Sequence, residues 1–433
     1  MMHDDERKTY AISIALIVTM FAIWGLAHRL YDTLLPEFAR ALQLDDNKLN
    51  LAQWILSFGY CLMVIPAAML MRNFGFKAGV TFGLGVFAVG MFLFYPAAEQ
   101  HQYYFLLLAA LTVGCGLALL EMAADPLIVT LGPVESAVRR LNLAQTLNPV
   151  GILVGLFVGR RIVQAHLQFT SSQLAHEIVK PYFLIGAGIL FFALLVDYID
   201  FPKVATERVK KDDRTLKDFA LLFGHKRYLR GAVALFLCSA SQVVLWGFTI
   251  AYAQGAPHDA ALYSGADILL WSLIAFTAGR GVGTALMYKL DPSRVLTAFA
   301  FAGAALVAGA AVSGNQFGKL CIVGASFCMS VFFPTIFGNA IRDLGPLNKA
   351  GSALLMCAAG CGAAALPLTN LLSRFIHIQY VMVVPSLGFF LIALFAMDFY
   401  NADKSASFSA HRATTPDRPS DTPPGDGRVG TLR

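Results

Sequence analysis

Residues 11–38 read AISIALIVTMFAIWGLAHRLYDTLLPEF, and this stretch decides the fold class. No ionisable side chain occurs in it before His28. A helix needs about 20 predominantly apolar residues to cross a bilayer, so the stretch is long enough to span one. It is also longer than the apolar part of a cleavable signal peptide, and residues 1–8 mix acidic and basic side chains. We therefore expect a retained membrane span at the start of the chain.

The rest of the chain has the same character. Of its 433 residues, 57% are hydrophobic and 14% are charged, and the mean hydropathy is +0.63. Soluble domains carry about 25% charged residues. Twelve apolar stretches of spanning length follow one another, at residues 11–38, 49–71, 77–96, 103–131, 138–165, 181–199, 228–254, 260–288, 294–313, 317–343, 349–375 and 379–400. The sequence thus predicts an all-α polytopic membrane protein embedded in a lipid bilayer.

The basic residues are distributed unequally between alternate loops. About 24 of the 33 Lys and Arg residues lie on the side that holds the N-terminus, residues 200–227 and the C-terminal tail. Cytoplasmic loops of membrane proteins are enriched in Lys and Arg. We therefore expect both termini in the cytoplasm, which requires an even number of spans. The net charge of +6 lies in loops beside spans, so it does not indicate binding to nucleic acid.

Two related halves are indicated by the longest loop and by repeated signals. The charged residues 200–227 separate a predicted N-terminal six-helix bundle, 1–199, from a C-terminal one, 228–401. The motif Leu-Gly-Pro follows the fourth span at 131–133 and the tenth at 344–346. This pattern is typical of the major facilitator fold, in which two six-helix bundles rock about a midplane site. Residues 402–433 are rich in Ser, Thr, Pro, Asp and Arg, and we expect a disordered cytoplasmic tail.

Ionisable residues inside spans are costly and indicate functional sites by default. The first group is His28, Arg29 and Asp32 in the first span, where Arg29 and Asp32 are neighbours on one helix face. With Tyr31 they form a candidate cluster for substrate or proton binding that faces a central cavity. The alternative is an internal ion pair that fixes helix packing.

The second group is in the fourth span. Glu121 stands between apolar neighbours, which makes its carboxyl a candidate proton carrier, or else a protonated carboxyl bound to a neighbouring helix. Asp125 is one turn nearer the cytoplasm and precedes Pro126, so a gate or kink partner is the expected role.

The third and fourth groups carry uncharged polar side chains. Asn142, Gln145 and Asn148 recur every three residues in the fifth span, and their amides suit the hydroxyls of a sugar. Amides equally hold helices together in lipid. In the seventh span Gln242 and Trp246 are four residues apart, which favours a sugar platform of hydrogen bonds and ring stacking, or ordinary packing.

Three further polar residues in the second half are weaker candidates. Asn339 and Asn370 resemble the amides of the first half in type. Arg280 is near the cytoplasmic end of the eighth span, where we expect its side chain to extend toward the interface or brace a loop.

Several classes of site are not indicated. Phosphate-binding loops, zinc-protease motifs and serine-hydrolase elbows are missing from the sequence, so we expect no enzyme, no catalytic residues and no cofactor. The seven cysteines lie in apolar runs without disulfide or zinc spacing, and we expect packing roles and no metal site. They are Cys61, Cys115, Cys238, Cys321, Cys328, Cys357 and Cys361.

Specific motifs resemble the fucose–galactose–glucose–proton symporter family of the major facilitator superfamily. They occur in order along spans one to eleven: 21–25 FAIWG, 32–36 DTLLP, 95–98 YPAA, 121–126 EMAADP, 131–133 LGP, 140–148 RLNLAQTLN, 333–337 FPTIF, 344–346 LGP and 349–352 KAGS. The resemblance implies that Asp32 and Glu121 couple proton movement to sugar binding. It also implies that Gln145, Asn148, Gln242 and Trp246 lie near the sugar.

Two departures from that family bear on the site. His28-Arg29-Leu30-Tyr31 replaces an asparagine-rich stretch before Asp32, and Arg29 favours an ionised Asp32, leaving Glu121 as the main titrating group. Pro149 follows Asn148 and should kink the fifth span and free a backbone carbonyl toward the cavity.

The sequence therefore favours a monomeric, multi-pass protein of the bacterial cytoplasmic membrane that imports a neutral monosaccharide with a proton. The partners are then a sugar, a proton and the bilayer. The alternatives are a sodium-coupled or passive carrier of a sugar, a carrier of a sugar acid held by Arg29, and a membrane sugar sensor that does not transport.

Overall fold

The computed structural model describes residues 4–165, 171–207, 215–255, 265–342, 344–362 and 364–414. Every regular element in these ranges is a helix. The first half holds α1 (Asp4–Ala41), α2 (Asp46–Phe92), α3 (Phe94–Glu99), α4 (Tyr103–Thr130), α5 (Ala137–Gln145), α6 (Leu147–Ala165) and α7 (Ser171–Tyr198). Two short helices follow, α8 (Lys203–Thr206) and α9 (Thr215–Leu222). The second half holds α10 (Lys226–Gly255), α11 (Gly265–Leu286), α12 (Pro292–Ser313), α13 (Gln316–Met329), α14 (Phe332–Ile341), α15 (Asn348–Gly362), α16 (Ala365–Leu372) and α17 (Val383–Thr414).

The helices account for the predicted spans. Among the described residues, ten helical stretches are long and apolar enough to cross a membrane. One of them, Trp54–Glu99, has 46 residues, and its backbone turns at Gly75 (φ 87°, ψ 173°), so it contains the second and third predicted spans. The eleventh predicted span is divided between α15 and α16, of 15 and 8 residues. The prediction of an all-α fold with membrane-spanning helices is confirmed.

The conformation of Gly75 explains how α2 can turn between two spans without a long loop. Its positive φ is a conformation that residues with a side chain rarely adopt. A Cβ atom at this position would lie 2.7 Å from the carbonyl oxygen of Ala205, just after the first half. The chain therefore turns between two crossings and packs directly against the linker.

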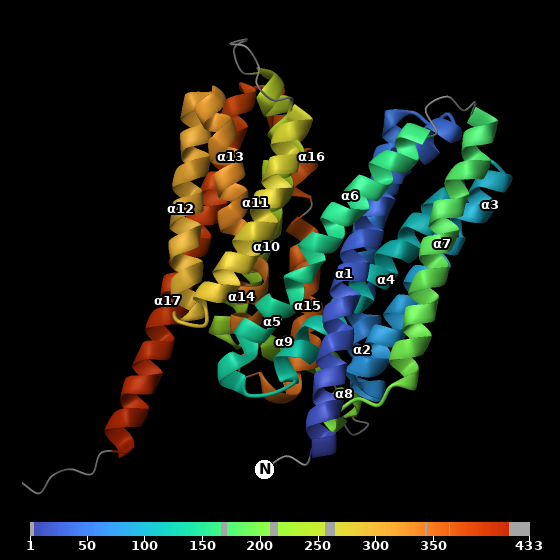
Figure 1. Ribbon diagram of the computed structural model, residues 1–433. Helices are drawn as coiled ribbons and strands as arrows, with labels where there is room; N and C mark the ends of the chain where they lie inside the picture. The colour runs from blue at the N-terminus through green and yellow to red at the C-terminus, as the bar shows by residue number, and fades with distance from the viewer. Residues whose placement is uncertain are drawn as a thin grey trace, which may run out of the picture.

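Figure 1 shows α1–α4, α6 and α7 gathered on one side of the molecule and α10–α13 and α17 on the other. The N-terminal end of α1, the short helices α8 and α9, and the C-terminal end of α17 lie at the same end of the molecule, as an even number of crossings requires (Figure 1). The boundaries of the two bundles stay a prediction.

The linker fastens both halves at this end, which we call the linker end. Arg72 of α2 pairs with Asp218 of α9, with Nη1 3.2 Å from Oδ2. Lys349 of α15 donates from Nζ to the carbonyl oxygen of Glu207 at 2.8 Å. Residues 208–214 lie outside the described residues.

The structure differs in part from the predicted disordered tail. The helix α17 continues to Thr414, so the beginning of the 402–433 segment is helical. Residues 415–433 lie outside the described residues.

Close contact between α1 and α6 positions part of the site. A Cβ atom on Gly25 would clash with the carbonyl oxygen of Asn148, and one on Gly151 would clash with that of Ala22. Small residues of this kind let helix backbones approach closely in membranes. The two helices are thereby held at a separation that only glycine permits, which fixes where Asn148 points.

Candidate functional site

A cavity with a volume of about 610 Å³ lies between the two halves. Small-molecule sites commonly have volumes of roughly 300–1,000 Å³. Helices α1, α2, α4, α5 and α6 line it from the first half, and α10, α11, α14, α15 and α16 from the second. Eight of the ten predicted site residues line this cavity: His28, Arg29, Asp32, Glu121, Gln145, Asn148, Gln242 and Trp246.

The cluster on α1 places two bases beside one acid. His28 Nε2 lies 3.9 Å from Asp32 Oδ1, and Arg29 Nη1 lies 3.9 Å from Asp32 Oδ2. These distances allow electrostatic attraction but exceed hydrogen-bond length. The Asp32 side chain is 44% exposed, so its carboxylate is held between two basic side chains and still reaches the cavity.

Tyr31 does not join this cluster. Its side chain is buried in the first half, and its ring meets that of Phe94 edge-on, with centroids 5.8 Å apart. Successive helix residues are about 100° apart, so Tyr31 lies about 100° around α1 from Asp32. The predicted cluster is thus correct in placement for His28, Arg29 and Asp32, and Tyr31 is instead part of the core.

Glu121 reaches the cavity from α4, half-buried between Leu120 and Met122, which are fully buried. It therefore faces the same space as Asp32 from a different helix. Two carboxyl groups that share one cavity provide two places where a proton can be held.

Gln145 and Asn148 line the cavity on either side of a break in the fifth span. The helix α5 ends at Gln145, and α6 begins at Leu147. Asn148 Nδ2 donates to the carbonyl oxygen of Phe21 on α1 at 3.2 Å. Gln145 Nε2 donates to Oδ1 of the fully buried Asp125 at 2.8 Å. Each amide is therefore oriented by a neighbouring helix.

Asn142 does not line the cavity. Its fully buried Nδ2 donates to Oγ1 of Thr335 on α14 at 3.1 Å, which joins the two halves. Asn339 is also buried and donates from Nδ2 to Ser293 Oγ at 3.2 Å, away from this cavity. Both amides hold helices together, the alternative that the sequence left open.

The prediction for Arg280 was wrong. Its side chain is only 5% exposed and lines the cavity. Its Nε donates to the carbonyl oxygen of Ser330 at 2.7 Å, and Nη1 donates to that of Gln145 at 3.2 Å. The guanidinium lies over the ring of Phe276, 4.9 Å from its centroid. Arg280 therefore faces inward and links α11 to α5 of the other half.

Two prolines explain the acceptors of Arg280. Proline has no N–H, so the carbonyl four residues earlier loses its helical partner. Pro149 leaves the Gln145 carbonyl without that partner, and Pro334 does the same for Ser330. Arg280 donates to both carbonyls. The carbonyl that Pro149 was predicted to free thus accepts from a side chain that lines the cavity, whereas the predicted kink stays a prediction.

From the second half, Gln242 and Trp246 of α10 line the cavity as predicted. Trp246 Nε1 donates to Ser326 Oγ at 3.1 Å, and its ring meets Phe276 edge-on at 5.1 Å. The indole is thereby fixed in orientation. Trp24 of α1 also lines the cavity and was not among the predicted residues, although it belongs to the FAIWG motif.

The hydrogen bonds from α5 to the second half lie on one side of the cavity. Along α5 and α6, Asn142 comes first and contacts Thr335, Gln145 follows and contacts Arg280, and Asn148 then lines the cavity. Since α5 begins near the linker end (Figure 1), the halves are joined at that end. The cavity can hold a small polar molecule beside two carboxyl groups, and the contacts at the linker end close the cavity on that side.

Comparison with known proteins agrees with this architecture. The sequence profile of the Major Facilitator Superfamily matches residues 12–354. The chain therefore belongs to the Major Facilitator Superfamily, and the predicted fold is confirmed. Its relatives are transporters and not enzymes, which confirms that prediction too.

Within this family the chain is similar to sugar transporters. It is 32% identical to the L-fucose-proton symporter of Escherichia coli strain K12 over 90% of this chain and 94% of that protein. It is 26% identical to the glucose/galactose transporter of Brucella abortus over 91% and 95%. The crystal structure of FucP in the outward conformation superposes with a TM-score of 0.83 at 30% identity, covering 90% of this chain and 99% of that one.

Proposed function

We propose that this protein is a secondary active transporter that imports a neutral monosaccharide together with a proton. One observation carries the proposal: Asp32 and Glu121 line the same cavity as Gln145, Asn148 and Trp246. Amides and an indole are suited to sugar hydroxyls and ring faces. Carboxyl groups at membrane depth are typical of proton relays. The likeness to L-fucose-proton symporters and glucose/galactose transporters supports both parts.

The proposed mechanism is alternating access. Proton and sugar enter the cavity together, and Glu121 takes up the proton. Neutralising that carboxyl removes the cost of enclosing its charge when the cavity closes. The contacts of Asn142 with Thr335 and of Arg280 with Gln145 then part as the halves rock, and the opposite side opens.

We further propose that the protein lies in the bacterial cytoplasmic membrane as a monomer, with the linker end in the cytoplasm. The excess of Lys and Arg in the loops on that side supports this orientation. The two bundles would then be residues 1–199 and 228–401. In this orientation the cavity is closed toward the cytoplasm by the contacts at α5, α11 and α14.

A second candidate substrate is a sugar acid. Arg29 and Arg280 both line the cavity. Guanidinium groups that face a cavity suit a carboxylate. Thermal-shift measurements with fucose, galactose, glucose and their uronates separate the two, because only a bound ligand raises the apparent stability. Stabilisation by uronates alone would favour the acid.

The coupling is tested in proteoliposomes with an imposed pH gradient and the Glu121→Gln variant. We expect gradient-driven accumulation to be lost and sugar counterflow to survive, because exchange needs no net proton movement. The control is Glu177→Gln, whose carboxylate pairs with Lys180 2.6 Å away, outside the cavity. If Glu121→Gln still accumulates sugar, Glu121 is not the proton carrier. Accumulation driven by a sodium gradient would favour the sodium-coupled carrier. Uptake that only runs down the sugar gradient would favour the passive carrier, and no uptake would favour the sensor.

A further inference from the structure

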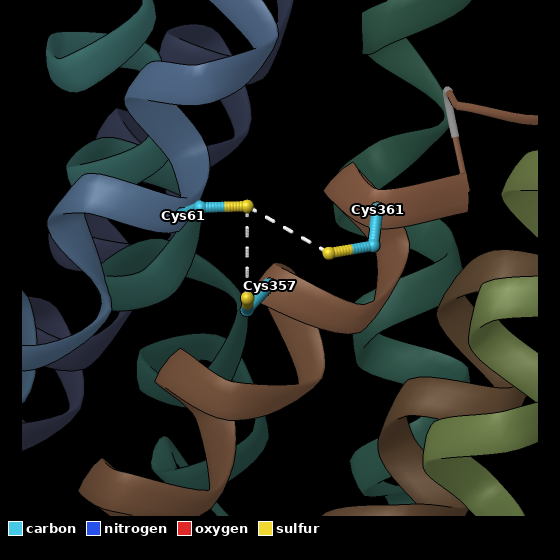
Figure 2. Close-up of side chains that lie close together, drawn as sticks. All are labelled: Cys61, Cys357 and Cys361. Carbon is cyan, nitrogen blue, oxygen red and sulfur yellow. Dashed lines mark hydrogen bonds between the residues drawn. The ribbon is translucent and has the colours of Figure 1, made fainter.

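Three cysteines converge between the two halves. Cys61 is on α2, and Cys357 and Cys361 are on α15 (Figure 2). The Sγ of Cys61 lies 3.7 Å from that of Cys361 and 3.9 Å from that of Cys357. All three sulfur atoms lie within 4.8 Å of one another, and all are free thiols. We call these residues the seam cysteines.

Two of the three sulfur separations, 3.7 and 3.9 Å, are close to those of metal ligands. A tetrahedral zinc site with Zn–S bonds of about 2.3 Å holds its sulfurs roughly 3.8 Å apart. Cys357 and Cys361 are four residues apart, so they share one face of α15. Cys61 meets them from a different helix. Ordinary packing of small apolar side chains does not require three thiols to point at one another.

The seam cysteines join parts of the protein that transport must separate. Helix α2 belongs to the first half and α15 to the second, and they are in contact. The central cavity reaches both helices, because Leu56 of α2 and Ala359 and Gly360 of α15 line it. An ion bound to all three sulfurs would tie α2 to α15 beside that cavity.

We propose that the seam cysteines form a three-thiolate site for one soft d¹⁰ metal ion such as Zn²⁺ or Cd²⁺, and that the bound ion slows transport by holding α2 against α15. Thiolates select such ions. On binding, each of the three S–H groups gives its proton to water and each sulfur forms a bond to the metal. The site goes beyond sugar and proton coupling, and its metal binding does not depend on which substrate is carried.

Metal binding is measured with Cd²⁺ on the purified full-length protein by the ultraviolet charge-transfer absorption of cadmium thiolate. We expect one Cd²⁺ per chain, and at least tenfold weaker binding in Cys61→Ser and in Cys361→Ser. The matched control is Cys115→Ser, a buried cysteine of α4 outside the cluster, which should bind Cd²⁺ as the wild type does. Absence of the absorption band, or its persistence in Cys61→Ser, would overturn the proposal.

The effect on transport is measured as sugar counterflow in proteoliposomes with and without Cd²⁺. We expect at least a tenfold slower exchange with Cd²⁺, full recovery after addition of a chelator, and resistance in Cys61→Ser. Cadmium that binds without slowing exchange would overturn the locking effect. If the protein binds Cd²⁺ but carries no sugar at all, the proposed sugar function fails while the metal site stands.

Discussion

Replacing Arg280 by methionine should weaken the contact between the two halves. Methionine fills a similar length without a hydrogen-bond donor. In the native protein Arg280 Nη1 donates to the Gln145 carbonyl of the other half, and Nε donates to the Ser330 carbonyl of its own half. The substitution removes both bonds and leaves both carbonyls without this partner.

The two hydrogen bonds lost in Arg280→Met affect different properties of the protein. A hydrogen bond to a charged group contributes about 1.5–3 kcal/mol. The bond to Gln145 exists only while the halves are joined, so its loss should shift the equilibrium between joined and parted halves by roughly 10- to 150-fold. The bond to Ser330 lies within the second half, so its loss should lower the thermal stability of that half by a similar free energy.

Hydrogen exchange measured by mass spectrometry separates the two effects. We expect faster exchange of α5 and α14 amides in Arg280→Met, with a smaller change in Asn142→Ala, which removes only the neutral bond to Thr335. The control is Arg294→Met, an exposed arginine over the ring of Tyr400 at 4.6 Å. Faster exchange in α14 with α5 unchanged would refute the idea that Arg280 joins the halves.

Two further substitutions test packing and the sugar platform. Gly151→Ala should lower the melting temperature by several degrees, because its Cβ would clash with the Ala22 carbonyl oxygen and overpacking costs about 1–3 kcal/mol. The control is Gly188→Ala, which should leave the melting temperature unchanged because a Cβ there would meet nothing within 4 Å. Trp246→Ala should weaken sugar binding about tenfold in thermal-shift titrations, since aromatic contacts contribute about 0.5–1.5 kcal/mol beyond buried area. Trp246→Phe keeps a ring but loses the bond to Ser326, so it should weaken binding less; equal loss in both variants would argue against stacking.

Hydropathy predicted the spans well because lipid forces backbone hydrogen bonds into helices. Periodicity then predicted most of the cavity, because polar residues three or four apart share a face. Periodicity gave the wrong placement for two residues whose packing partners determine where the side chain lies. Tyr31 is adjacent to Asp32 in sequence but faces Phe94 in the core. Asn142 continues the spacing of Gln145, yet Thr335 of the other half takes its amide.

The seam cysteines could not be predicted from spacing. Cys61 and Cys361 are 300 residues apart and meet only because α2 and α15 face each other across the halves. Within one half, Cys357 and Cys361 provide only two ligands at helical spacing. A cluster of thiols built between the halves therefore leaves no local motif, and only the three-dimensional placement brings it to light.

Arg280 is different, because each part of its interaction is visible in the sequence. An intramembrane arginine needs acceptors, and Pro149 and Pro334 each leave one carbonyl without a helical donor. The positions of those carbonyls follow from counting back four residues, to Gln145 and Ser330. What the sequence does not contain is that the breaks in the two spans face α11 from opposite halves. A buried cation in another helical membrane protein can be matched to prolines in the same way, because each proline within a span frees a carbonyl four residues earlier.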